Sequence, residues 1–296
     1  MKQFIIKGIA CLALLAAIDV AVGYTHGMIF GNLPDKTSMV STIYYSLFKK
    51  SADVLILGSS TANHHYNSKM MEDSLGMSVY NSGLDGRDMI YFDVVLQSAI
   101  QRHVPKYVVL DIGAVHLDGS WINRISDTKL YYGENEPVTH YYDTETDWQQ
   151  RLKLMSSTYR YNKTLSYLIR VAIDNPNILN GFSPMKGEMK IITRTTNNVF
   201  HVDSVELCHL NNIVSLCENN SINLVLVQSP QANDNVAFDK WIEDYSKKQN
   251  IELIEENKNA EYYKRPELFR DENHLNFAGA NKFTSAILKN LKMLEK

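Results

Sequence analysis

Buried strands and helices alternate along most of the chain. Short apolar runs, which are typical of strands buried on both faces, lie at residues 53–58, 77–80, 107–111, 222–227 and 251–254. Helical patterns are found at residues 68–75, 88–103, 202–217, 238–248 and 277–294. Short connections between alternating strands and helices predict a parallel sheet with helices on both faces. We therefore expect a three-layer α/β/α fold with a mostly parallel, five-stranded, flavodoxin-like sheet.

The alternation is interrupted between the third and fourth predicted strands. Residues 117–200 contain no run typical of a buried strand, and they are polar and rich in tyrosine. We interpret them as an insertion with helices near residues 148–154 and 165–173. Sites in open α/β sheets form at the carboxyl ends of the strands. The insertion begins at the carboxyl end of the third strand, so we expect it to form one wall of the site. Its aromatic side chains either stack on sugar rings or pack the insertion's own small core.

The first 30 residues have a different pattern. Lys2 and Lys7 flank the start of an apolar run over residues 8–22 that is interrupted only by Asp19. Such a segment is typical of a secretion signal or an uncleaved signal-anchor. In both cases the lysines favour an outward-facing carboxyl-terminal part. We expect residues 1–30 to be the signal or anchor, and residues 31–296 to be one extracytoplasmic domain, either membrane-anchored or secreted to the periplasm.

Composition narrows the class of protein. The chain has 296 residues, 45% of them hydrophobic, and a net charge of −3. This is an ordinary globular composition that can bury a sizeable core, and it lacks the basic footprint of nucleic-acid-binding proteins. Among the three cysteines, Cys208 and Cys217 are too far apart on a continuous helix for a disulfide. We expect both to be buried thiols, and no metal-type cysteine spacing is present.

A serine follows the first predicted strand in the segment Gly58-Ser59-Ser60. Gly58 permits a tight turn at the end of the strand. Ser60 would then stand near the start of a helix, where backbone N–H groups are unpaired and can stabilise an oxyanion. Taken alone, either serine could simply cap that helix.

A carboxylate and a histidine lie just before the last predicted helix. Asp271 and His274 are three residues apart, so they can turn toward each other in a loop. A histidine can take the proton of a serine hydroxyl, and a carboxylate can fix the tautomer of its ring. Taken alone, they are loop residues in front of a helix capped by Asn276.

A glycine block follows the second predicted strand, from Asn81 to Gly86. The N–H of Gly83 can serve as an oxyanion donor, or the block can be an ordinary turn. In an α/β sheet this block, the serine segment and the Asp-His loop can converge on one crevice.

Together the three segments resemble the sequence blocks of GDSL/SGNH hydrolases, over residues 53–113 and 202–290. The resemblance implies an SGNH-type fold with Ser60 as nucleophile and first oxyanion donor. It also implies Gly83 as second oxyanion donor, Asp271 as orienting acid and His274 as base. No metal ion or other cofactor is implied.

Two positions depart from the family pattern. Ser59 replaces the usual aspartate of the first block, as in cell-envelope members with a Gly-Ser-Ser form. Val115 stands where the third block has an asparagine that donates to the oxyanion. Three consequences remain open: another donor substitutes, with Asn81 or Asn63 as candidates, or the enzyme is slow, or the chain is not an enzyme.

The substrate-binding candidates are the polar residues near the strand ends: Asn63, His64, His116, Gln228 and Ser229. We expect an extracytoplasmic serine ester hydrolase that removes acyl groups, acetyl in the first instance, from a carbohydrate or another ester substrate. One alternative is a polysaccharide O-acyltransferase with the same triad. Another is a catalytically inactive glycan-binding or assembly protein.

Overall fold

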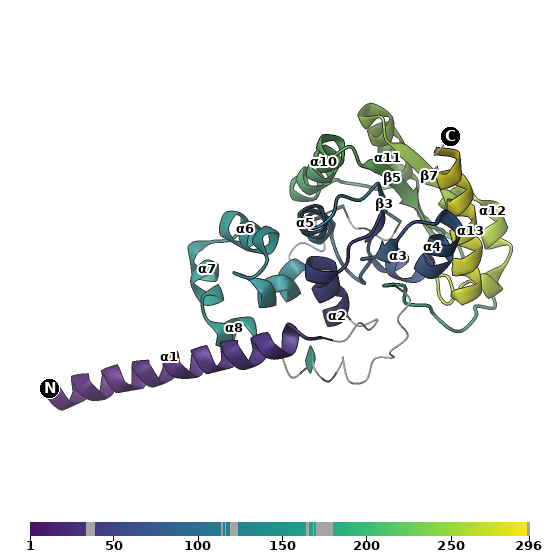
Figure 1. Ribbon diagram of the computed structural model, residues 1–296. Coiled ribbons are helices and arrows are strands. Elements are labelled where there is room, and N and C mark those ends of the chain that lie inside the picture. The colour runs from purple at the N-terminus through teal and green to yellow at the C-terminus, as the bar shows by residue number, and fades with distance from the viewer. Residues whose placement is uncertain are drawn as a thin grey trace.

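The computed structural model describes residues 1–33, 39–113, 115, 117–118, 124–163, 166–167, 169 and 180–294. One long helix, α1 (Lys2–Phe30), projects from a body built around a parallel sheet (Figure 1). The body's first helical turns are α2 (Met39–Tyr44) and the π-helical turn Tyr45–Lys49.

Five strands form one parallel sheet in the order β2-β1-β3-β5-β7. They are β1 (Val54–Gly58), β2 (Val79–Asn81), β3 (Tyr107–Asp111), β5 (Asn223–Gln228) and β7 (Glu252–Glu255). The strand order reverses between β1 and β3, whose last residues Gly58 and Asp111 are paired in register. Such a switch point leaves a crevice at the carboxyl ends of the strands. The predicted five-stranded parallel sheet is confirmed.

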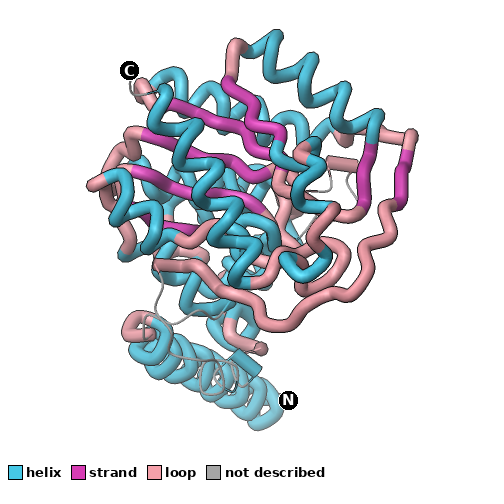
Figure 2. The backbone as a smooth tube through the Cα atoms, turned by 90° about the vertical axis from the view of Figure 1, so that its right-hand side faces the viewer, coloured by secondary structure: helices cyan, strands magenta, loops and turns pink. Residues whose placement is uncertain are grey.

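Helices cover both faces of the sheet, which confirms the predicted three layers (Figure 2). On one face lie α5 (Met89–Ile100), α10 (Ser204–Asn219) and α11 (Val236–Gln249). On the other lie α3 (Ser60–His65), α4 (Ser68–Leu75), α12 (Ala260–Tyr263) and α13 (Phe277–Leu294). Cys217 of α10 is buried as predicted, but Cys208 is exposed because it faces solvent on the opposite side of the helix.

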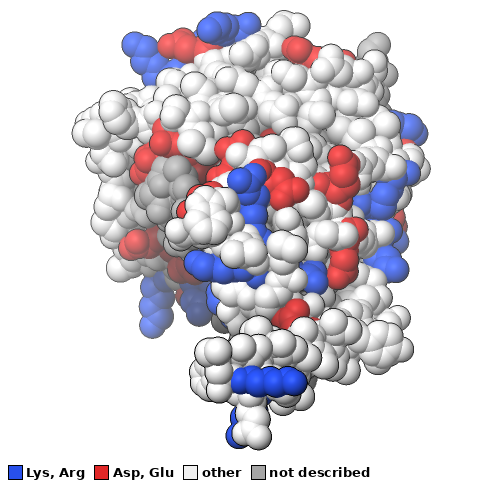
Figure 3. Space-filling view, turned by 90° about the vertical axis from the view of Figure 1, so that its left-hand side faces the viewer, with Lys and Arg blue, Asp and Glu red and all other residues white. Residues whose placement is uncertain are grey.

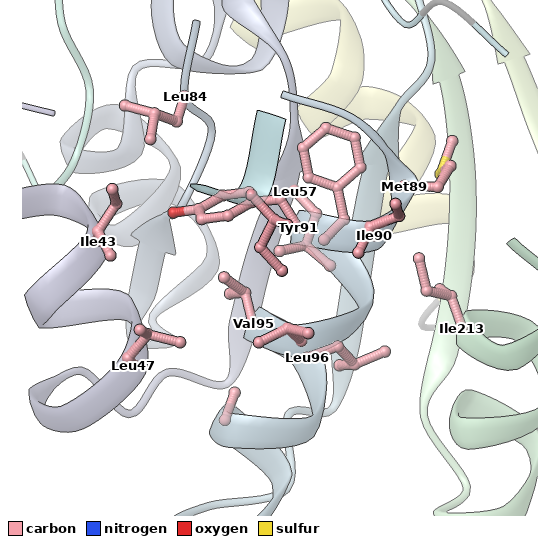
Figure 4. Packing of buried hydrophobic residues seen from close by; sticks show 14 of the residues in the cluster. Ile43, Leu47, Leu57, Leu84, Met89, Ile90, Tyr91, Val95, Leu96 and Ile213 are labelled. Carbon is pink, nitrogen blue, oxygen red and sulfur yellow. The ribbon is translucent and has the colours of Figure 1, made fainter. Parts of the chain in front are cut away.

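The strands divide their apolar side chains between two cores, because successive residues of a strand point to opposite faces. In β1, Leu55 and Leu57 pack on the α5 side, and Val54 and Ile56 pack on the α13 side. Figure 4 shows Leu57 packed beside Tyr91 of α5. Each such buried side chain contributes about 1.5–3 kcal/mol of hydrophobic stabilisation, which keeps the strand ends in place beneath the site.

Most of the described helical residues of the insertion lie in its first half, within residues 124–160. The insertion contains the 3₁₀ turn Arg124–Tyr131 and the helices α6 (Glu136–Glu145), α7 (Trp148–Leu154) and α8 (Ser157–Arg160). Helix α7 was predicted, whereas α6 was not, although Asn135 caps it by accepting the N–H of Val138. The helix predicted at residues 165–173 lies largely outside the described residues.

The insertion returns to the body through a short second sheet. In it β4 (Thr195–Asn197) pairs in parallel with β6 (Asn233–Asn235). Five of the insertion's tyrosines are buried, namely Tyr131, Tyr141, Tyr142, Tyr161 and Tyr167. These rings therefore pack in the protein core, and stacking on sugar rings is not their role.

Candidate active site

Ser60, His274 and Asp271 lie in a hydrogen-bonded row, although 214 residues separate the serine from the histidine. His274 Nε2 is 2.8 Å from Ser60 Oγ, and His274 Nδ1 is 2.8 Å from Asp271 Oδ1. Because an ionised carboxylate can only accept, Nδ1 carries the proton, and Nε2 is left to accept from the serine hydroxyl. The predicted nucleophile, base and acid are thus brought together in the order that a serine hydrolase requires.

The turn before Ser60 depends on glycine. Gly58 has φ +145°, and a β-carbon on it would lie 2.6 Å from the carbonyl oxygen of Asp111. Side-chain-bearing residues disfavour both features. The turn places Ser60 at the first position of α3, and no described residue accepts a hydrogen bond from its N–H. This orphan N–H is a donor for charge that develops beside the hydroxyl.

The loop that carries the acid and base is held by its own hydrogen bonds. Asp271 Oδ1 also accepts from the N–H groups of Asn273 and His274, at 3.0 and 3.1 Å. Leu275 N–H donates to His65 Nε2 over 2.9 Å, which ties the loop to α3. The position of His274 relative to Ser60 is therefore set by backbone contacts as well as by side chains.

A buried carboxylate that sequence reasoning missed lies beneath the nucleophile helix. Asp111 ends β3 and accepts the hydroxyls of Thr61 (2.6 Å), Tyr66 (2.6 Å) and Ser229, and the N–H of Gly113 (2.9 Å). Burial raises the pKa of Asp111, although these donors favour its ionised form. The carboxylate fastens α3 to the ends of β3 and β5. The signal in the sequence was a lone aspartate that closes an apolar strand.

The predicted oxyanion donors Gly83 and Asn81 are corrected by the structure. The N–H of Gly83 donates to Asn81 Oδ1 over 2.8 Å, and Asn81 Nδ2 donates to the carbonyl of Ala62 over 2.6 Å. Both residues are buried, because they hold the end of β2 against α3. Asn81 Nδ2 also donates to the carbonyl of Tyr66 over 3.5 Å, so neither group has a hydrogen left for a substrate oxygen.

Asn63 and His64 also have partners within the protein instead of facing the cleft. Asn63 Nδ2 donates to Asp85, and His64 lies between Asp85 and the carbonyl of Ser183. Both acceptors need a proton from the ring of His64, so the ring is a cation in this geometry. Burial alone would lower the pKa of His64, but the hydrogen bond and charge of Asp85 outweigh it and the pKa is raised. Neither residue lines the cleft beside Ser60, and their substrate-binding role stays a prediction.

The two candidates at the end of β5, Gln228 and Ser229, also lie outside the cleft beside Ser60. Gln228 is buried and donates to Asp239 over 2.7 Å, and the buried Ser229 donates to Asp111. Strand β5 turns their side chains inward, so the loop that follows it reaches the cleft in their place. His116 lies outside the described residues.

A cleft of about 710 Å³ opens beside Ser60 and His274. The insertion and its return strand supply one wall, as predicted, with Leu117, Asp118, Asn197, Val199 and Phe200. Five carboxamides line it: Asn197, Gln231, Asn233, Asn235 and Asn273. The described lining residues include no lysine or arginine, and Asp118 is the one carboxylate among them, so most of the hydrogen-bonding groups that the cleft offers are neutral.

One of these carboxamides lies near the position of the missing asparagine. Val115 lines the cleft, and its side chain carries no hydrogen-bond donor. Gln231 Nε2 lies 2.8 Å from the point where a β-carbon on Gly113 would be, and Gly113 borders the cleft with Ser60. No described residue accepts a hydrogen bond from this nitrogen. Gln231 was not predicted, because it belongs to a loop far from the third block in sequence.

No protein family model and no curated protein matches the chain. Among solved structures, it is similar to a protein assigned to the lipolytic G-D-S-L family from Desulfitobacterium hafniense. The identity is 12%, the TM-score 0.41, and the match covers 80% of this chain and 97% of the other. It is also similar to a two-domain esterase active on acetylated mannans, crystallised with mannopentaose. The identity is 9%, the TM-score 0.38, and the match covers 81% of this chain and 48% of that one. Both likenesses are distant.

Proposed function

We propose that the chain is a serine ester hydrolase of the GDSL/SGNH type whose domain works outside the cytoplasm. The observation that carries this proposal is the row Ser60–His274–Asp271, with 2.8 Å at each step. A serine hydroxyl becomes a useful nucleophile only when a base can take its proton, and this row supplies that base in the required tautomer.

In the proposed reaction, Ser60 Oγ attacks the ester carbonyl carbon and its proton passes to His274 Nε2. The tetrahedral intermediate expels the alcohol, which leaves with the proton from His274, and an acyl-serine remains. Water then attacks the acyl-serine and gives its proton to His274. The carboxylic acid is released, and Ser60 recovers its proton. Asp271 stabilises the imidazolium in both halves.

The negative charge on the intermediate needs donors. The N–H of Ser60 is one, because it stands unpaired at the start of α3. We assign the second role to Gln231 Nε2, which lies beside Gly113 and has no acceptor among the described residues. In this assignment a carboxamide from the loop after β5 replaces the asparagine that Val115 displaces.

The cleft supports a neutral, hydroxyl-rich substrate. A carboxamide both donates and accepts hydrogen bonds without a charge, which suits sugar hydroxyls and ester carbonyls. Phe200 and Phe238 add an aromatic wall for an apolar face of the substrate. We therefore propose an acylated, uncharged carbohydrate as the substrate class, with acetyl as the first acyl group to test.

Helix α1 supports the proposed location of the domain outside the cytoplasm. It is long and apolar enough to cross a membrane, with a mean hydropathy of 2.3, and it stands at the amino terminus as a signal or anchor does. The lysines at its start favour an outward-facing domain.

The test uses the full-length chain in detergent with 4-nitrophenyl acetate and with acetylated mannan, xylan and glucomannan. We expect acetate release that Ser60→Ala abolishes. Acetyl transfer to an added sugar in place of acetate release would identify an O-acyltransferase. A folded protein that binds the glycans but neither hydrolyses nor transfers would contradict the proposal and favour a binding protein.

A further inference from the structure

The second half of α1 is bound to the insertion by a polar contact. Asp19, the one acidic residue of this apolar helix, accepts the hydroxyl of Ser156 over 2.7 Å. It also accepts the N–H groups of Ser157 and Thr158, at 2.9 and 2.8 Å. These are the first N–H groups of α8, which have no partner within their own helix. Asp19 therefore caps α8 from another helix.

Close packing continues along the same side of α1. A β-carbon on Gly23 would lie 2.6 Å from Ser157 Oγ, so only glycine fits there without a shift. Further on, His26 and Phe30 stack on Tyr161, with ring centroids 5.0 and 5.8 Å apart. Phe30 is 1% exposed and belongs to the main core. The predicted domain boundary after residue 30 falls at the end of α1, and the last turns of the helix before it pack against the insertion.

Residues 2–18 of α1, in contrast, are exposed throughout. Residues 2–18 extend about 26 Å as a helix, close to the hydrocarbon thickness of about 30 Å. The sequence Ala21-Val22-Gly23 at the end of the apolar run is a candidate signal-peptidase site. Cleavage after Gly23 would remove the cap of α8 along with the exposed segment. The contacts fit a helix that is retained and that leaves the membrane at Asp19.

Helix α7 carries an exposed apolar face near the point where α1 leaves the body. Trp148, Leu152 and Met155 are spaced to share one face, and they are 65%, 59% and 74% exposed. Met155 directly precedes Ser156, which bonds to Asp19, so this face lies where α1 leaves the body. In Figure 1 α7 lies above α1 on the side toward the amino terminus, and Figure 3 views the molecule from that side.

From these contacts we infer that α7 lies in the outer interface of the bilayer that α1 crosses. The occupant of its apolar face is lipid. A tryptophan at the membrane–water boundary and neighbouring basic residues, here Arg151 and Lys153, are typical of interfacial helices. Asp19 and the α8 cap set the depth of this helix. The insertion thus holds the domain against the membrane in one orientation, independently of the proposed hydrolysis.

The first test is the mass of the full-length chain recovered from membranes through a carboxyl-terminal tag. The inference requires residues 1–30 to be present in the mature protein. A chain that begins at Tyr24 would overturn it.

The second test measures lipid contact directly in lipid nanodiscs. The exposed Cys11 and Cys208 are replaced by serine, and an NBD fluorophore is attached at Leu152→Cys or, as the control, at the exposed Lys240→Cys on α11. We expect the probe at position 152 to be quenched by lipids with a shallow spin label and to be several-fold less sensitive to aqueous iodide than the probe at 240. Equal iodide quenching at the two positions would overturn the inference.

A third measurement examines the cap. Asp19→Ala should raise iodide quenching at position 152. Helix α8 loses its cap in this variant, and α7 is then no longer held at a fixed depth in the membrane interface. Asp19→Asn keeps an oxygen that can accept the N–H groups of α8, so it should raise iodide quenching less than Asp19→Ala does. No change with Asp19→Ala would refute the role given to Asp19. Fluorophosphonate labelling of Ser60 should be the same in all these proteins. A failure of the membrane contact can therefore be told apart from a failure of the proposed activity.

Discussion

The hydroxyl of Tyr66 donates to the buried carboxylate of Asp111 over 2.6 Å, and this bond joins the end of the nucleophile helix to the end of β3. Thr61 donates to the same carboxylate one residue after Ser60. The proposed nucleophile is therefore held from below by a buried hydrogen-bond network around Asp111.

Removing the hydroxyl should cost stability. Tyr66→Phe takes one hydrogen bond from a buried carboxylate, and we expect a loss of about 2 kcal/mol in the free energy of unfolding. Chemical denaturation of the two proteins measures it. Tyr107→Phe, at the other end of β3, is the matched control and should change stability by less than about 0.5 kcal/mol. Equal effects of the two substitutions would contradict the role of Asp111.

Glu206 should make stability depend on pH. Burial, and then the charge of Asp88, raise its pKa to about 7 from 4.5. The folded protein therefore binds the proton more tightly than the unfolded chain. This stabilisation is fully present below pH 4.5 and is lost as pH rises through 7, by up to about 3 kcal/mol.

Glu206→Gln should remove this dependence, because the amide oxygen can still accept the N–H of Met89 without ever carrying a charge. Melting temperatures at pH 5 and pH 8 test this prediction. Relative to the parent protein, the variant should have a higher melting temperature at pH 8 than at pH 5. A parallel pH dependence in both proteins would show that Glu206 titrates normally.

Gln231 should act on the rate of reaction more than on binding. Loss of one oxyanion donor typically costs about 10²–10³ in kcat, and we expect that loss in Gln231→Ala with KM little changed. The matched control is Gln149→Ala, at an exposed position on α7. If KM rises and kcat is kept, Gln231 binds substrate and the second donor lies elsewhere.

Asp271→Asn should leave the loop intact and inactivate the base. The asparagine oxygen can still accept the N–H groups of Asn273 and His274. The same oxygen would still face His274 Nδ1, but it would carry no charge, so the imidazolium that forms during the reaction would lose the carboxylate that stabilises it. We expect kcat/KM to fall about 10³–10⁴-fold, whereas Asp244→Asn on the surface of α11 should match the parent. A small effect of Asp271→Asn would mean that another group orients His274.

The sheet and its helices could be predicted because their apolar patterns are periodic and long. The strand 107–111 and the helices 68–75 and 148–154 were predicted with the bounds that the structure has. The helices of the insertion were harder to predict from sequence. Its tyrosines are amphipathic, and its buried side chains pack against the body of the protein. Helix α6 was missed for this reason.

The sequence indicates candidate site residues where local spacing carries the geometry, and it misses them where contacts between distant segments decide. Asp271 and His274 are neighbours in a loop, and Ser60 follows a turn that only glycine permits, so sequence indicates all three. The role of Asn81 depended on whether its amide turned to the cleft or to Ala62, which packing alone decides. Gln231 reaches the site through the loop after β5, and no local pattern marks it.

The measurement that tests the central claim most directly is labelling of the full-length protein with a fluorophosphonate, followed by peptide mass spectrometry. The account predicts a phosphonylated Ser60, with labelling lost in Ser60→Ala and His274→Ala and kept in Ser51→Ala, an exposed serine ahead of β1. A folded parent protein that takes no label, or takes it on another serine, would contradict the assignment of Ser60, His274 and Asp271 as a working triad.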